Sequence, residues 1–131
     1  MKVVLDTSAA LEIAFHRRKA MPLAEALLGA DERLAPHFLV AEATNAVWKE
    51  HQLGGASLAT CETALDIVLN LVAVWVPSTE LCARAFELSR VERTPAYDMF
   101  YLALARREKA LLLTMDAGLR KAAVRHGVRT A

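Results

Sequence analysis

Residues 94–116 read TPAYDMFYLALARREKALLLTMD and predict a helix followed by a strand. After Pro95 the apolar residues recur at helical spacing, whereas residues 110–113 form a short apolar run without alternation. Such a run is typical of a strand that is covered on both faces, as in a parallel sheet. Two carboxylates, Asp98 and Asp116, stand within this apolar stretch, although Asp is rarely buried without a partner.

The alternation of strand and helix continues along the whole chain. Strand-like runs lie at 2–5, 33–35, 73–76 and 110–113, with a weaker one at 127–129. Helical patterns occupy 8–17, 21–30, 37–53, 58–71, 78–91, 96–109 and 117–126. Parallel strands require crossover connections, and the intervening helices supply them. The sequence therefore predicts an α/β fold: a three-layer α/β/α sandwich around a central parallel five-stranded sheet, with residues 1–131 forming one domain.

The composition excludes several classes of protein. With 55% hydrophobic and 24% charged residues and a net charge of +1, the chain is neither disordered nor fibrous. Its five glycines form no P-loop and no G-x-G-x-x-G, which argues against a nucleotide-binding enzyme. Asp6 ends the apolar run that begins in MKVVL (1–5) before the apolar core of a signal peptide can form. The longest aliphatic and aromatic run, Leu71–Val76, is too short to span a bilayer. We expect a cytoplasmic protein without a membrane partner.

Four acids are expected at one edge of the predicted sheet. In parallel sheets, ligands bind beyond the carboxyl ends of the strands. Asp6 follows the first strand and Asp116 follows the fourth, while Asp98 begins the helix that leads back to the fourth strand. Glu42 lies in the early turns of the helix after the second strand. Each acid alone could end a strand, cap a helix or face solvent, but four such coincidences at one edge favour a site.

A cluster of acids requires something to offset its charge. Two carboxylates about 4 Å apart repel by roughly 4 kcal/mol at an effective dielectric near 20. No single Lys or Arg is placed by the sequence among all four acids. An all-oxygen site is the kind that Mg²⁺ or Mn²⁺ prefers, and these ions promote phosphoester hydrolysis. Asn45, one helical turn after Glu42, is expected to support the site.

The acids lie in four stretches, VVLDTSA (3–9), LVAEATNAVWK (39–49), TPAYDMFYLALA (94–105) and ALLLTMD (110–116). In order and spacing the chain resembles the PIN domain family and, within it, the small VapC-type toxins of type II toxin–antitoxin systems. The resemblance implies that Asp6, Glu42, Asp98 and Asp116 are the catalytic and metal-binding quartet, supported by the hydroxyls of Ser8 and Thr114. One departure is Gly118, where many relatives carry a further acid.

The resemblance also implies an activity and partners. It implies a Mg²⁺- or Mn²⁺-dependent endoribonuclease that hydrolyses RNA phosphodiester bonds, forms a homodimer and is held inactive by a cognate antitoxin protein. An apolar run of helical surface could supply the dimer contact: Leu65, Val68, Leu69, Leu71 and Val72. Basic residues near the predicted edge are candidates for contact with the RNA backbone: Arg17, Arg18, Lys19, Arg90 and Arg93.

Two other functions remain open from the sequence. The first is a PIN-fold interaction module that has lost catalysis, because an intact set of acids does not establish turnover. The second is an α/β protein that transfers a phosphoryl group through an aspartate at the end of the first strand. That chemistry requires a second acid next to Asp6 or two residues away, where Thr7 and Ser8 stand instead.

Overall fold

The sheet contains four strands, and every neighbouring pair is parallel. The structure is a computed structural model that describes residues 1–131. The strands are β1 (Lys2–Leu5), β2 (Glu32–Pro36), β3 (Val74–Val76) and β4 (Leu111–Leu113), in the order β3-β2-β1-β4. The helices are α1 (Thr7–Ala14), α2 (Ala20–Leu28), α3 (Leu39–Gln52), α4 (Leu58–Leu71), the 3₁₀ turn η1 (Ser78–Glu80), α5 (Cys82–Glu92), α6 (Tyr97–Glu108) and α7 (Ala117–Arg125).

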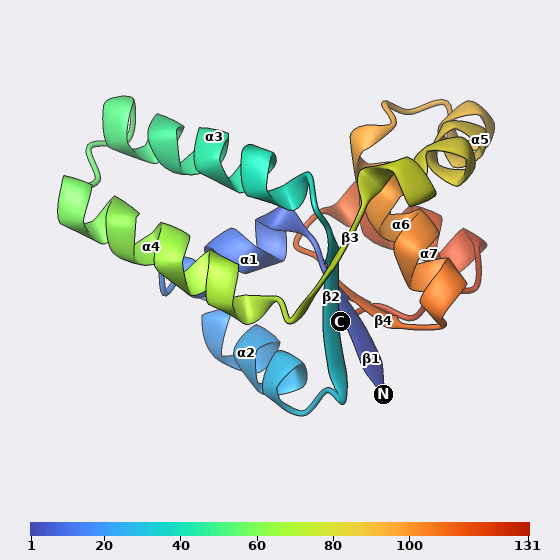
Figure 1. Cartoon of the computed structure of the whole chain (residues 1–131), viewed down its shortest axis with the longest axis horizontal. Coiled ribbons are helices and arrows are strands. Elements are labelled where there is room, and N and C mark those ends of the chain that lie inside the picture. The colour runs from blue at the N-terminus through green and yellow to red at the C-terminus, as the bar shows by residue number, and fades with distance from the viewer.

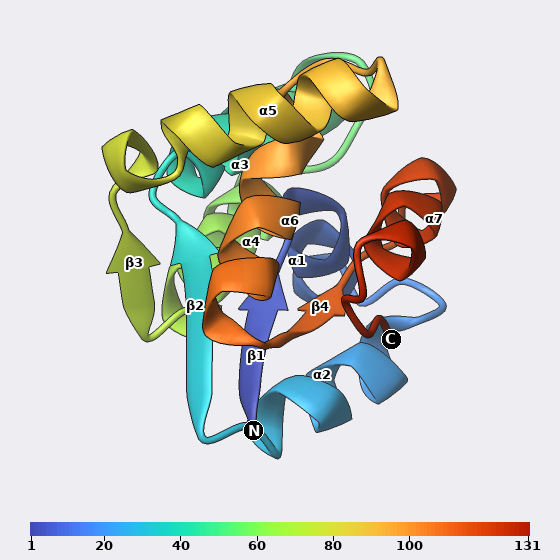
Figure 2. The ribbon, with the colours of Figure 1, turned by 90° about the vertical axis from the view of Figure 1, so that its right-hand side faces the viewer.

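The helices cover both faces of the sheet. Figure 1 shows the sheet between α1–α4 on one side and α5–α7 on the other, which gives the three predicted layers. Figure 2 shows α6 lying directly over the strands. Residues 101–105 of α6 are therefore all buried, although a helix on the surface would alternate apolar and polar faces. Val3, Val4 and Leu5 of β1 are fully buried as well, as the unalternating run predicts.

The prediction of a fifth strand at 127–129 is wrong. Beyond α7 the chain turns at Gly127, whose φ is +73°, and then meets β4 at one isolated parallel bridge between Leu112 and Thr130. The amide of Leu112 donates to the Arg129 carbonyl at 2.9 Å, and the amide of Ala131 donates to the Leu112 carbonyl at 3.1 Å. A strand needs consecutive pairs of this kind, and the ladder does not extend beyond this one bridge.

The predicted helix boundaries differ from those of the structure mainly at the ends. The interval 78–91 is divided into η1 and α5, and Ser57 caps α4 as expected, since its Oγ accepts from the Thr60 amide at 3.1 Å. Both cysteines are free; Cys61 is buried and Cys82 is exposed. None of the helices combines the length and the apolar character that crossing a membrane would require.

The strand order places a crevice at the carboxyl ends of β1 and β4. After β1 the chain adds β2 and β3 on one side, whereas β4 lies on the other side of β1. This reversal of direction separates the connections that leave β1 and β4, and ligands of open α/β sheets bind at such points. The residues that follow β1 and β4 are Asp6 and Thr114, and Asp116 lies two residues beyond Thr114.

Candidate active site

Asp6 links the end of β1 to the start of α1 and is almost fully buried, with 3% of its surface exposed. Its Oδ1 accepts from the Ala9 amide at 2.8 Å, as an N-cap residue does, and from Ser8 Oγ at 2.7 Å. Its Oδ2 accepts from Thr114 Oγ1. Burial raises the pKa of Asp6, and these three hydrogen bonds oppose that rise. The carboxylate is thus both a helix cap and a fixed group in the crevice.

Two hydroxyls join the ends of β1 and β4. Ser8 Oγ accepts from the Met115 amide at 2.9 Å, and Thr114 Oγ1 accepts from the Asp116 amide at 3.0 Å. Asp116 is itself the N-cap of α7, since its Oδ1 accepts from the Leu119 amide at 2.7 Å. The network therefore sets Asp6 and Asp116 on either side of the junction between the two strands.

Glu42 is held by hydroxyls from two other helices. Tyr101 of α6 donates its OH to Glu42 Oε1 at 2.6 Å, and Thr7 Oγ1 lies 3.0 Å from the same oxygen. The two hydroxyl oxygens are themselves 2.7 Å apart. Glu42 Oε2 takes no hydrogen bond, so one carboxylate oxygen is left for a ligand. The sequence analysis did not identify Thr7 or Tyr101 as site residues; their only signals were the positions next to Asp6 and one turn after Asp98.

Asp98 is half-buried in the first turn of α6 and makes no hydrogen bond, and the N-cap position of this helix is occupied by Ala96. Its pKa is raised to about 6, first by burial and then by the negative charges of Asp116, Asp6 and Glu42. The four predicted acids therefore lie close enough to act on one another. They line a cavity of about 270 Å³ whose wall contains no Lys or Arg: Asp6, Thr7, Ser8, Leu11, Glu42, Asp98, Tyr101 and Asp116.

The side chains that line this pocket offer the kind of ligand atoms that a hard divalent cation prefers. Four carboxylates supply oxygen ligands and no basic side chain offsets their charge within the lining. The side chains do not form a ready-made cage, since no group of three or more His, Cys, Asp or Glu is placed so that it could hold a metal ion. A Cβ at Gly118 would lie 3.2 Å from Asp116 Oδ1, although Gly118 itself is not among the residues that line the pocket.

The other predicted site residues lie outside the acidic pocket. Asn45 is exposed on α3 and is not part of the lining. Arg17 pairs with Glu50 at 2.7 Å. Lys19 lines a different pocket. The remaining basic candidates are exposed and form no ion pair: Arg18, Arg90 and Arg93.

The family model of the PIN domain matches residues 3–125. The fold is similar to that of PAE2754 from Pyrobaculum aerophilum, with a TM-score of 0.77 and 22% identity over 99% of this chain and 83% of that one. No curated protein matches the sequence.

Two further solved structures share the fold. VapBC2 from Rickettsia felis, solved bound to a DNA fragment from its promoter, has a TM-score of 0.69 and 19% identity over 100% of this chain and 98% of that one. FitAcB from Neisseria gonorrhoeae has a TM-score of 0.64 and 17% identity over 98% and 95%. At these identities the structural likeness concerns the fold.

Proposed function

Because the chain belongs to the PIN domain family, with the match covering residues 3–125, we propose that it is a divalent-metal-dependent endoribonuclease. The reaction is hydrolysis of RNA phosphodiester bonds at the acidic pocket. The observation that carries the proposal is Asp98, a half-buried carboxylate without a hydrogen bond, whose pKa of about 6 reflects burial and three neighbouring acids. Such perturbed groups in a cleft are candidates for function, because the fold gains nothing from their repulsion.

Asp6, Glu42, Asp98 and Asp116 would hold Mg²⁺ or Mn²⁺. When bound, such an ion supplies Lewis-acid chemistry, lowering the pKa of water and offsetting charge on the phosphodiester. The protein holds its carboxylates in position before any ligand arrives: Ser8 and Thr114 fix Asp6, and Tyr101 fixes Glu42. Asp98, which nothing fixes, is free to adjust to the ligand.

The same proposal includes a biological role. We place the chain among the VapC-type toxins that its four sequence stretches resemble, as one nuclease domain spanning residues 1–131 that acts in the cytoplasm. Its fold, shared with a chain of VapBC2 at a TM-score of 0.69, supports this placement. A cognate antitoxin protein would then bind the chain and cover the acidic pocket.

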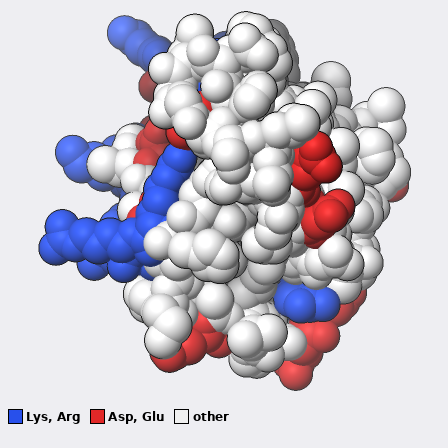
Figure 3. Space-filling view, turned by 90° about the vertical axis from the view of Figure 1, so that its left-hand side faces the viewer, with Lys and Arg blue, Asp and Glu red and all other residues white.

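A homodimer is part of the proposal, but the surface suggested by the sequence has to be replaced. Val68 and Val72 are core residues with 1% and 6% exposure, and Leu65 and Leu71 are partly buried against the core. Of the predicted residues only Leu69, with 47% exposure, is therefore available to a partner. The connected ends of α3 and α4 instead expose Trp48, Leu53 and Leu58. Figure 3 shows the side of the molecule that carries these helix ends, where the middle is largely uncharged and Lys and Arg project along one edge. We propose this apolar end as the dimer contact.

The direct test is cleavage of a panel of structured RNAs with Mg²⁺, with Mn²⁺ and with EDTA. Asp98→Asn is expected to slow cleavage at least about 100-fold, since it removes a charged group needed only for the reaction. Asp66→Asn is the matched control, because Asp66 is exposed on α4 and its carboxylate has no partner. Cleavage by Asp98→Asn at the parental rate would reject this site. No cleavage by the parent with either ion would favour the catalytically silent interaction module.

A further inference from the structure

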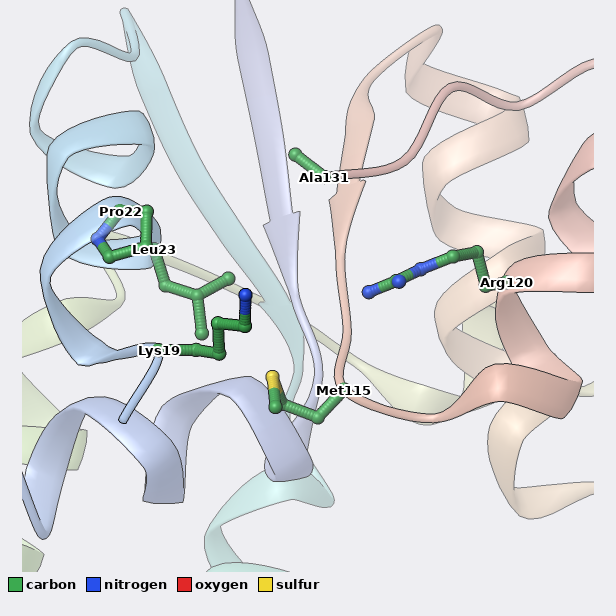
Figure 4. Close-up of a pocket in the computed structure, with 6 residues that line it drawn as sticks. All are labelled: Lys19, Pro22, Leu23, Met115, Arg120 and Ala131. Carbon is green, nitrogen blue, oxygen red and sulfur yellow. The ribbon is translucent and has the colours of Figure 1, made fainter. Parts of the chain in front are cut away.

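A second pocket lies beside the acidic one, on the other side of the turn that joins β4 to α7. It has a volume of about 310 Å³ and is lined by Lys19, Pro22, Leu23, Met115, Arg120 and Ala131. Figure 4 shows Lys19 and Arg120 reaching toward it from opposite sides, from the start of α2 and from α7. Met115 lines this pocket whereas the next residue, Asp116, lines the acidic pocket, so a single turn separates the two.

Both cations of this pocket lack an acidic partner. Neither Lys19 nor Arg120 forms an ion pair, as is true of most Lys and Arg in the chain, but these two line one pocket whose other side chains carry no charge. Two like charges directed into one concave space repel, and an anion between them would relieve this. The structure therefore places two basic side chains without an acidic partner next to the acidic pocket.

Backbone groups fix the guanidinium of Arg120 and anchor the residue that carries the Lys19 ammonium group. Arg120 donates from Nη2 to the Thr114 carbonyl at 2.7 Å, which sets its guanidinium at the carboxyl end of β4. Lys19 gives its backbone amide to Glu12 Oε2 at 2.9 Å, and Glu12 is 9% exposed, so the start of α2 is anchored while the ammonium group remains free. Arginine retains further donors for a ligand when one is engaged in this way.

The apolar residues of the lining restrict which class of ligand fits the pocket. Pro22, Leu23 and Met115 supply an apolar surface for van der Waals contact with a sugar or a base, without an aromatic ring for stacking, and Lys19 and Arg120 supply donors suited to a phosphate. A nucleotide unit combines both. An acidic protein segment would match the cations but would have no use for the apolar wall.

We infer that the Lys19–Arg120 pocket binds one nucleotide of the RNA strand, with its phosphate between the two cations, next to the bond that is cut. The strand would cross the β4–α7 turn from this pocket to the acidic pocket. The inference rests on the proposed nuclease function. It adds Arg120 to the residues expected to contact RNA and removes Arg17, because Arg17 is already paired with Glu50.

Binding measured without metal separates this inference from catalysis. Single-stranded RNA oligonucleotides are titrated in EDTA against Lys19→Gln/Arg120→Gln and against the control Lys49→Gln/Lys121→Gln. Both double variants lose two positive charges, and Lys49 and Lys121 are exposed and unpaired. The pocket variant is expected to bind about tenfold more weakly at low salt, with a shallower dependence of affinity on salt, while the control stays near the parent.

Every outcome decides the inference. Equal RNA affinity of the two double variants overturns it, even if the pocket variant has lost affinity for a protein partner. The inference is also overturned if the parent protein does not bind RNA. The nuclease proposal is tested separately, by the cleavage assay. Lys19→Gln alone must show part of the loss, because it disturbs no contact with the β4–α7 turn. A loss confined to variants that carry Arg120→Gln would instead assign the effect to the Thr114 contact.

Discussion

Asp98 differs from the other acids of the pocket because no hydrogen bond stabilises its charge. Asp6 accepts three hydrogen bonds, Glu42 accepts from Tyr101, and Asp116 caps α7. Asp98 has only burial and three negative neighbours, which raise its pKa to about 6. In the absence of metal its charge therefore costs the folded state free energy.

We predict that Asp98→Asn raises the melting temperature in EDTA at pH 7.5. The folded pKa of Asp98 lies above its unfolded value near 3.8, so the folded state of the parent loses stability as pH rises from about 4 through 6. The asparagine variant avoids this loss. Because the side chain is partly exposed, the gain is about 1 kcal/mol, or roughly 3–6 °C. Thermal melts followed by circular dichroism measure it.

The pH dependence of this effect provides its control. The gain from Asp98→Asn should be full above about pH 7 and disappear below about pH 4, where the parent carboxyl is protonated in both states. Asp66→Asn, on an exposed face of α4, should change little at any pH. A lower melting temperature for Asp98→Asn at pH 7.5 would mean that the carboxylate has a stabilising partner, and the argument for a strained site would be wrong.

At the scale of elements, Tyr101 connects three helices through one hydroxyl group. It lies on α6 with 1% exposure, it donates to Glu42 of α3, and it lies 2.7 Å from Thr7 of α1. The packing of α6 on the sheet thereby also orients a carboxylate of the pocket. Loss of this hydroxyl should affect Glu42 more than it affects the core, because the aromatic ring remains in place.

We predict that Tyr101→Phe weakens Mn²⁺ binding, measured by isothermal titration calorimetry, by about tenfold, because an orienting neighbour of a ligand has been removed. Stability should fall by about 1 kcal/mol for the lost hydrogen bond. Tyr97→Phe is the matched control: Tyr97 lies one turn earlier on α6 with 67% exposure. Unchanged Mn²⁺ affinity in Tyr101→Phe would limit the hydroxyl to a structural role.

These contacts also show where prediction from the sequence ends. The edge that carries Asp6 and Asp116 could be predicted, because both follow apolar strand runs and the carboxyl ends of parallel strands meet. The contact between Tyr101 and Glu42 could not, because it depends on how α6 and α3 are placed relative to each other around the sheet, which spacing within one helix does not determine. A tyrosine in the apolar run of α6 is indistinguishable from ordinary core until its partner is known.

At the scale of the whole molecule, the sequence pattern predicted the three layers correctly but predicted one strand too many in the sheet. Val3, Val4 and Leu5 are buried on both faces, as an unalternating run requires. Residues 127–129, Gly-Val-Arg, contain a single β-branched apolar residue, and the strand they suggested amounts to one bridge at Thr130. Sheet pairing is decided by the path of the chain beyond α7, and composition alone carries no information about that path.

The exposed apolar end of α3 and α4 leads to the last prediction, which concerns association. Leu53 and Leu58 are 77% and 61% exposed and flank the turn between the two helices. Burying such side chains against a second copy is favourable, and a stable dimer needs about 800 Å² from each partner around an apolar centre. We predict that the parent is a dimer at micromolar concentration and that Leu53→Glu/Leu58→Glu is a folded monomer, as measured by light scattering.

The control tests whether any exposed apolar pair would have this effect. Phe86 and Val91 on α5 have similar exposure, 65% and 61%, so Phe86→Glu/Val91→Glu adds the same charge to a different surface. This variant should remain a dimer, and neither variant should unfold, because none of the four side chains belongs to the core. Dissociation by the α5 variant alone would move the interface to α5. A monomeric parent would remove the homodimer from the proposed function while leaving the acidic pocket, which one chain completes by itself, unaffected.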